Sequence, residues 1–183
     1  MIIWKMDTNL NGFASLSSLD HDKSFEISIN FDGRRFGSKW NPLEYTKYYE
    51  HKELPLSDAP FSVPGIPIFS IKAIECLKEV LGKNMEILPV YIDEQEFYLL
   101  NVLEVVDCLD YDKSEIKYFS GEPKRIMKIV KYAFIEQKLN GKNIFRIKEQ
   151  KRAGLFVTDK FKEAVEKSGL EGFEFREVWG SEK

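Results

Sequence analysis

Acidic residues gather between positions 107 and 115, where their spacing first suggests a calcium site. Asp110 and Asp112 alternate in the way that carboxylates do in a calcium-binding loop. Such a loop needs glycine at its sixth position and a bidentate glutamate at its twelfth, and this chain has Glu115 and Gly121 there. We therefore expect no metal here. The segment is predicted to be an acidic turn after a buried strand, or a rim in which Asp107, Asp110 and Asp112 repel nucleic acid and attract a basic protein surface.

The two histidines offer little basis for catalysis. His21 lies between two aspartates, and His51 occurs in a different segment of the chain. Neither belongs to a nucleophile elbow, a phosphate-binding loop, a dinucleotide-binding fingerprint or a zinc-protease motif. We therefore expect a protein that is not an enzyme and needs no cofactor, and keep a site around His21 or the turn at 107–115 as a minor alternative.

An aromatic cluster is the stronger candidate for binding. Aromatic and arginine side chains are enriched at binding hot spots because they supply a large contact area. They occur together in one loop-rich segment, as Trp40, Tyr45, Tyr48 and Tyr49 near Arg34 and Arg35. The alternative is that these rings pack over one face of a sheet and stabilise the long connection around them.

Positive charge is concentrated in residues 123–152. This segment holds ten Lys or Arg and two Glu, a net charge of +8, so the rest of the chain carries −11. The cations could form a basic stripe that binds nucleic acid or an acidic protein. They could instead lie on solvated faces and meet the acidic remainder of the fold. We favour the second interpretation because the segment contains no recognisable nucleic-acid-binding motif.

Composition favours an α+β protein with mostly antiparallel or mixed sheets and two or three packed helices. The 183 residues suffice for one domain, and 14 Phe, 8 Tyr and 3 Trp suit sheets and contact surfaces. No apolar run approaches the roughly 20 residues of a membrane helix, and the N-terminal run is too short for a signal peptide. Cys76 and Cys108 fit no metal spacing and are expected to be small buried residues in a reducing cytoplasm.

The N-terminal third is predicted to contain two strands and a long connection. Residues 1–6 and 25–31 read as strands, the second because Phe25, Ile27, Ile29 and Phe31 alternate with polar residues. The Asp32-Gly33 pair after it predicts a hairpin turn back onto residues 35–36. Five prolines in residues 37–67 indicate an irregular segment. Residues 101–109 are predicted to be the central strand, and residues 125–139 fit either a strand or a helix.

A strand, helix, glycine and strand occur in this order twice. Residues 68–69 precede a helix capped by Ser70 and ended by Gly82, before an extended segment at 87–92. In the second unit, residues 144–147 form a predicted buried strand. A helix follows, with Phe161, Ala164 and Val165 on one face; Thr158 or Asp159 can cap it and Gly169 ends it. A strand that contains Phe173, Phe175 and Val178 comes last. An offset of 87 residues superimposes Phe69 on Phe156, Glu79 on Glu166 and Gly82 on Gly169, a weak indication of an internal repeat.

These patterns together resemble one family. This chain resembles immunity proteins of bacterial polymorphic toxin systems in four segments that occur in the same order: the helical segment 62–81, YLLNVLEVVDCLD at 98–110, IFRI at 144–147 and VTDKFKEAVEKSGLEGFEF at 157–175. The resemblance covers about the last two-thirds of the chain, a core at 61–183, and matches residues 1–60 only loosely. It favours a strand over a helix for residues 125–139. It implies a cytoplasmic protein that neutralises a cognate toxin by stoichiometric contact without catalysis. Contacts are then expected from the aromatic cluster and the acidic turn, and a nucleic-acid-binding module using residues 123–152 is the alternative.

Overall fold

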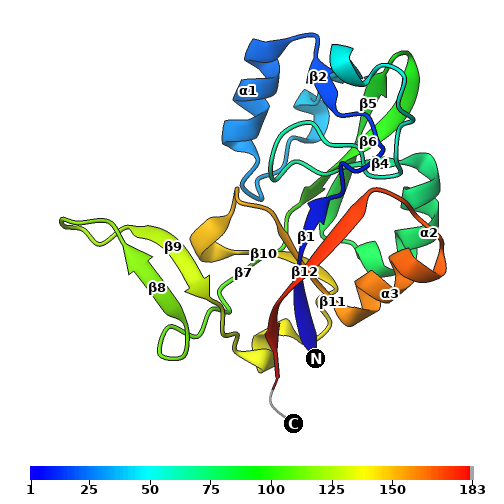
Figure 1. Cartoon of the computed structure of the whole chain (residues 1–183). Helices are drawn as coiled ribbons and strands as arrows, with labels where there is room; N and C mark the ends of the chain where they lie inside the picture. The colour runs from blue at the N-terminus through cyan, green and yellow to red at the C-terminus, as the bar shows by residue number, and fades with distance from the viewer. Residues whose placement is uncertain (182–183) are drawn as a thin grey trace.

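The computed structural model describes residues 1–181, which contain three α-helices and twelve strands (Figure 1). The helices are α1 (His21–Asn30), α2 (Ile71–Leu81) and α3 (Asp159–Lys167), and four short 3-10 helices are η1 (Gly37–Lys39), η2 (Tyr49–His51), η3 (Glu136–Leu139) and η4 (Lys148–Gln150). The strands are β1 (Ile2–Thr8), β2 (Leu16–Ser18), β3 (Glu44–Lys47), β4 (Ile68–Ser70), β5 (Met85–Ile92), β6 (Gln95–Val102), β7 (Val105–Val106), β8 (Glu115–Tyr118), β9 (Ile126–Lys131), β10 (Ile144–Ile147), β11 (Leu155–Thr158) and β12 (Phe173–Gly180).

The strands form two five-stranded sheets and one separate hairpin. The first sheet has the order β12-β1-β11-β10-β7, and the second has the order β2-β3-β5-β6-β4. Each contains one parallel pair, β10 with β7 and β3 with β5, among antiparallel ones. The hairpin β8–β9 stands apart on one side of the molecule (Figure 1). The predicted α+β class with mixed sheets is confirmed.

The internal repeat corresponds to a shared connectivity. In the second sheet, β4 and β5 both pair antiparallel with β6, which lies between them, and α2 connects β4 to β5. In the first sheet, β11 and β12 both pair antiparallel with β1, and α3 connects β11 to β12. The two helices lie together on one side of the molecule (Figure 1). Both units therefore place a third strand between the two strands that the helix joins.

Three apolar clusters occupy the faces of these sheets. The first lies under α2 and α3 and includes Leu77, Phe161 and Val157. The second lies between α1 and the second sheet, and the third covers the other face of the first sheet, where Phe134 and Phe156 meet at 5.7 Å between ring centroids. The sheets are thus covered by helices or by irregular chain, as burial of their apolar residues requires.

The predicted helix ends of α2 are confirmed, and α3 begins differently. The Ser70 hydroxyl accepts a hydrogen bond from the Ala73 amide at 3.0 Å, which satisfies one free N–H of the first turn. Gly82 and Gly169 have φ of 75° and 58°, a region that glycine enters without a Cβ penalty. Thr158 is the N-cap residue of α3, but its side chain makes no capping hydrogen bond, and Asp159 accepts hydrogen bonds from the Ile2 amide and the Trp4 indole of β1.

The prediction of a strand at 25–31 was wrong. Residues 25–30 belong to α1 and Phe31 is its C-cap residue; at the start of the helix, the Asp20 carboxylate accepts a hydrogen bond from the Lys23 amide at 2.9 Å. Ile27 and Phe31 are four residues apart and face the core, whereas Phe25 is 68% exposed. The alternation of apolar and polar residues fits a helix as well as a strand, because every fourth residue of such an alternation lies on the same helix face. Asp32-Gly33 follows a helix, so the predicted hairpin back onto Arg35 and Phe36 is absent.

Other predictions need smaller corrections. The expected central strand at 101–109 is divided, since Asn101 and Val102 end β6 of the second sheet and Val105–Val106 form β7 at an edge of the first. The irregular segment 37–67 contains one strand, β3. Residues 126–131 are a strand, as the resemblance implied. Cys108 is buried as predicted, but Cys76 is exposed because it lies on the outer face of α2.

Candidate functional site

The fold separates the predicted aromatic cluster into core and surface residues. Tyr45 on β3 is only 2% exposed and belongs to the core. Trp40 is half-buried, and its indole N–H donates a hydrogen bond to the carbonyl oxygen of Pro89 at 3.0 Å. Tyr48 and Tyr49, at the start of η2, are 40% and 68% exposed. Trp40 and Tyr45 therefore support the sheet, whereas Tyr48 and Tyr49 are exposed to solvent.

The exposed Tyr48 lines a cavity between α1 and β2. The cavity has a volume of about 330 Å³ and is lined by His21, Phe25, Tyr45 and Tyr48 together with several serines. The Tyr48 ring packs against the Tyr49 ring at 5.3 Å and, edge-on, against the imidazole of His51 at 5.8 Å. These contacts hold the ring of Tyr48 in place.

The histidines do not assemble into a catalytic or metal centre within residues 1–181. His21 is the first residue of α1 and is exposed. The Nδ1 of His51 lies 2.9 Å from the hydroxyl of Ser15, a contact that ties η2 to the chain before β2. The described residues include no group of three or more His, Cys, Asp or Glu side chains placed to hold a metal ion.

The acidic residues come from a different sheet, after β7. Asp107 accepts a hydrogen bond from the Lys148 ammonium at 3.0 Å, and this ion pair holds the pKa of Asp107 below its usual value. The Asp110 carboxylate accepts hydrogen bonds from the amides of Asp112 and Lys113, each at 3.2 Å, and thereby shapes the turn. Asp112 itself is exposed. The predicted aromatic and acidic residues therefore belong to two separate surfaces.

The basic segment 123–152 does not form one stripe. Lys142 pairs with Glu104 at 2.7 Å and Lys148 with Asp107, so part of its charge meets acidic side chains as the favoured interpretation expected. Arg146 is fully buried on β10. The exposed cations Lys124, Arg125, Lys128 and Lys131 lie instead on the β8–β9 hairpin.

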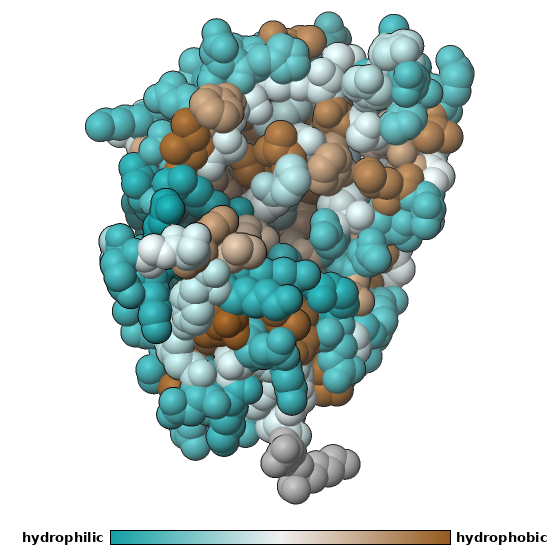
Figure 2. Space-filling view, turned by 60° about the vertical axis from the view of Figure 1, so that its left-hand side comes forward, coloured by the Kyte–Doolittle hydropathy of each residue, from teal (hydrophilic) through white to brown (hydrophobic). Residues whose placement is uncertain are grey.

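Sequence analysis missed the hairpin as a surface. It exposes large apolar side chains as well as cations, with Tyr118, Phe119, Met127 and Val130 at least 40% exposed. The guanidinium of Arg125 lies over the Phe119 ring at 5.7 Å. A signal was present in the turn sequence Ser120-Gly121-Glu122-Pro123 between two short apolar alternations. Figure 2, in which this side of the molecule comes forward, shows brown apolar side chains exposed between teal ones.

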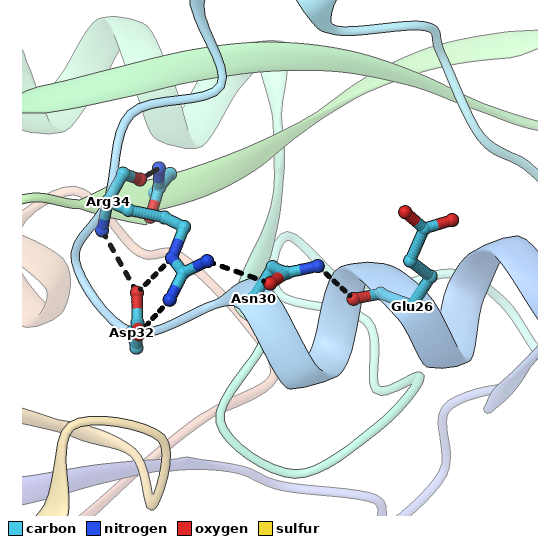
Figure 3. Close-up of polar contacts among 5 residues, drawn as sticks. Glu26, Asn30, Asp32 and Arg34 are labelled. Carbon is cyan, nitrogen blue, oxygen red and sulfur yellow. Dashed lines mark hydrogen bonds and ion pairs between the residues drawn. The ribbon is translucent and has the colours of Figure 1, made fainter.

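A chain of polar contacts positions the end of α1 against the second sheet. Figure 3 shows Arg34 donating to the Asp32 carboxylate from Nε and Nη2, both at 2.9 Å, and to the side chain of Asn30 at 3.0 Å. Asn30 in turn donates to the carbonyl oxygen of Glu26 at 3.0 Å. The carbonyl oxygen of Arg34 accepts a hydrogen bond from the buried amide of Asn101 at 2.7 Å. The end of α1 is thus fixed both internally and to β6.

Glu86 and Arg146 complete this framework. The Glu86 carboxylate, on β5, accepts hydrogen bonds from the amides of Phe36 and Gly37, both at 2.8 Å. Arg146 donates to the carbonyl oxygens of Val102 and Lys151 at 3.1 and 2.8 Å, and its guanidinium lies 4.7 Å from the centroid of the Phe31 ring. Burial lowers the pKa of Arg146 to about 10.

Comparison with known proteins bears on what these surfaces do. A search of the curated proteins gave no match. No helix within residues 1–181 has the length and apolar character needed to cross a membrane. Residues 92–179, which run from the end of β5 through almost all of β12, match the model of an immunity protein family (Imm11).

Proposed function

We propose that this protein neutralises a cognate toxin of a bacterial polymorphic toxin system by binding it stoichiometrically. The observation that carries the proposal is the match of residues 92–179 to an immunity protein family. The matched segment contains the acidic turn and the whole β8–β9 hairpin, and both present side chains to solvent. Binding takes place in the cytoplasm, a compartment that suits the unpaired thiols of Cys76 and Cys108.

Inhibition of this kind needs no turnover. A partner that covers the active site of a toxin or holds one of its conformations blocks it for as long as the complex lasts. Affinity then depends on a few well-packed, desolvated side chains more than on total buried area. The rate of dissociation is therefore the quantity that decides protection.

The predicted contact residues that reach solvent are Tyr48, Tyr49, Asp107 and Asp112. The two tyrosines are the stronger candidates, because the Tyr48 amide donates to the carbonyl oxygen of Ser15 at 2.8 Å and its ring is already packed. Little conformational entropy is lost when such a side chain is covered. We propose that these tyrosines anchor part of the contact.

The test is a titration of the toxin domain encoded in the neighbouring gene. Its activity is measured while the protein is added at concentrations well above the dissociation constant. Stoichiometric neutralisation predicts a linear fall of activity that ends at one equivalent, with a 1:1 complex in light scattering. Complete protection at a small fraction of one equivalent would show turnover and contradict the proposal. Absence of binding and of protection in co-expressing cells would refute an immunity function against this toxin.

A further inference from the structure

The β8–β9 hairpin carries positive charge that the rest of the described fold does not compensate. Lys117, Lys124, Arg125, Lys128 and Lys131 are all exposed. None of them forms an ion pair with a carboxylate of residues 1–181, whereas Lys142 and Lys148, in the segment that follows the hairpin, do. Lys117, Lys124, Arg125 and Lys128 are therefore available to a partner, whereas Lys131 lies opposite Glu115 in the strand register.

Two of these cations are placed at a cost to the hairpin. Lys117 on β8 lies directly opposite Lys128 on β9 in the antiparallel register. Like charges directly opposite each other destabilise a strand pair, and an isolated two-stranded sheet has little stability to spare. A carboxylate placed between the two ammonium groups would remove the repulsion. This pair therefore favours an anionic partner.

Apolar side chains accompany the charge. Phe119 is 49% exposed and Met127 is 52% exposed, and Arg125 stacks over the first of them. Arginine and large apolar side chains side by side are typical of the centre of a protein interface, where contacts are desolvated. The hairpin also projects from the sheets, so a partner can reach it without moving another element (Figure 1).

We propose that the β8–β9 hairpin docks against an acidic surface of the toxin, which rests on the proposed function above. A protein suits the surface better than nucleic acid does. The cations end at the base of the hairpin, where Asp110, Asp112 and Glu115 precede or begin β8 and would repel a longer polyanion. A compact acidic face of a folded protein meets the cations and avoids these carboxylates.

Lys128→Glu provides a test in which binding and stability change in opposite directions. The substitution places a carboxylate opposite Lys117 and replaces repulsion by attraction, so we expect Tm to rise by about 1–3 °C. Association with the neighbouring toxin domain should slow by about three- to tenfold at 50 mM salt, and the difference should shrink at 500 mM salt. A substitution that acted only by damaging the fold would lower both quantities.

Lys78→Glu is the matched control, since Lys78 is an exposed lysine on α2 and the change in net charge is the same. Its association rate should stay within about twofold of the unchanged protein. Equal rates for Lys128→Glu and the control would overturn the hairpin proposal while leaving the proposed function intact. Failure of the unchanged protein to bind the toxin would overturn both. A third outcome would identify nucleic acid, not an acidic protein surface, as the partner of the hairpin. In that case the protein would bind a labelled 20-nucleotide DNA or RNA in a salt-sensitive way, and Lys128→Glu would weaken this binding without changing association with the toxin.

Discussion

Replacing Glu86 by glutamine should detach the segment after α1 from the second sheet. The Glu86 side chain is 8% exposed, and its two carboxylate oxygens accept three hydrogen bonds, from the amides of Phe36 and Gly37 and from the Asn101 side chain at 2.9 Å. The Arg35 guanidinium lies 3.8 Å away. A glutamine of the same shape can present one oxygen, so its NH2 group must face one of these donors.

The expected loss of stability follows from these contacts. One buried N–H left without an acceptor costs about 1–3 kcal/mol. The other two hydrogen bonds remain but become weaker, because their acceptor is no longer charged. Since solvent screens part of that charge, the loss for these two bonds together is on the order of 1 kcal/mol. Glu86→Gln should therefore lower the free energy of unfolding by about 3 kcal/mol, a large part of the usual 5–15 kcal/mol. The urea midpoint should fall by about 1–2 M.

The effect should depend on pH. Burial opposes ionisation of Glu86, but the amides of Phe36 and Gly37, then Asn101 and Arg35, outweigh burial and hold its pKa below the ordinary value of 4.5. A carboxyl group whose pKa is lower in the folded state stabilises the fold above its unfolded pKa, and this contribution is lost as the pH falls through the folded value. The difference between the two proteins should be full at pH 7 and should shrink below about pH 4.

Urea unfolding followed by circular dichroism at pH 7 and at pH 3 measures both quantities. Glu79→Gln on the exposed face of α2 is the control, and its free energy of unfolding should change by less than about 0.5 kcal/mol. An equal urea midpoint for Glu86→Gln and the unchanged protein would refute the assignment of Glu86 as the anchor. A difference that is the same at both pH values would refute the role of its charge.

Three further predictions concern helix α1, Gly172 and the two cysteine thiols. Because α1 is a helix, Ile27→Ala should cost about 2–4 kcal/mol in urea unfolding and Phe25→Ala less than about 0.5 kcal/mol, and a strand would not separate them in this way. Gly172→Ala should cost about 2 kcal/mol or more in the same assay, since φ is 84° and the new Cβ would clash with the side chain of Ser57. Burial raises the pKa of Cys108 to about 12, so mass spectrometry should find iodoacetamide on Cys76 alone until the protein unfolds.

The last two-thirds of the chain were the more predictable part of the fold. A capping serine, an apolar face with helical spacing and a glycine stop act within a few residues, and α2 forms where Ser70 and Gly82 predicted it. The family resemblance, now confirmed over residues 92–179, depends on the same local patterns and their order. Local signals of this kind survive in the folded protein because tertiary packing agrees with them.

The errors arose where tertiary packing decides between two local possibilities. Residues 25–31 satisfy both a strand and a helix pattern, and the capping contact of Asp20 together with burial of Ile27 and Phe31 selects the helix. No local pattern marks the break between Val102 and Val105, where the chain leaves one sheet and joins the other.

The candidate site was predictable only by residue type. Aromatic character identified Tyr45 and Tyr49 equally, yet the first lies in the core and the second is exposed, because exposure depends on which face of β3 and η2 meets the sheet. The opposition of Lys117 and Lys128 could not be read from the sequence, since it requires the strand register. Charge content alone therefore indicated the basic segment without showing where its cations are free.

The position of β1 has a consequence for how this protein is made. β1 is synthesised well before both of its partners, β11 and β12, which lie beyond residue 154. At cellular rates of translation, roughly 10–30 s separate the synthesis of β1 from that of its partners. During that time β1, with its apolar residues Ile3 and Met6, must remain unpaired or be bound by a chaperone. A growing chain therefore cannot complete this sheet until β12 has been made, and any binding that depends on the sheet starts only then.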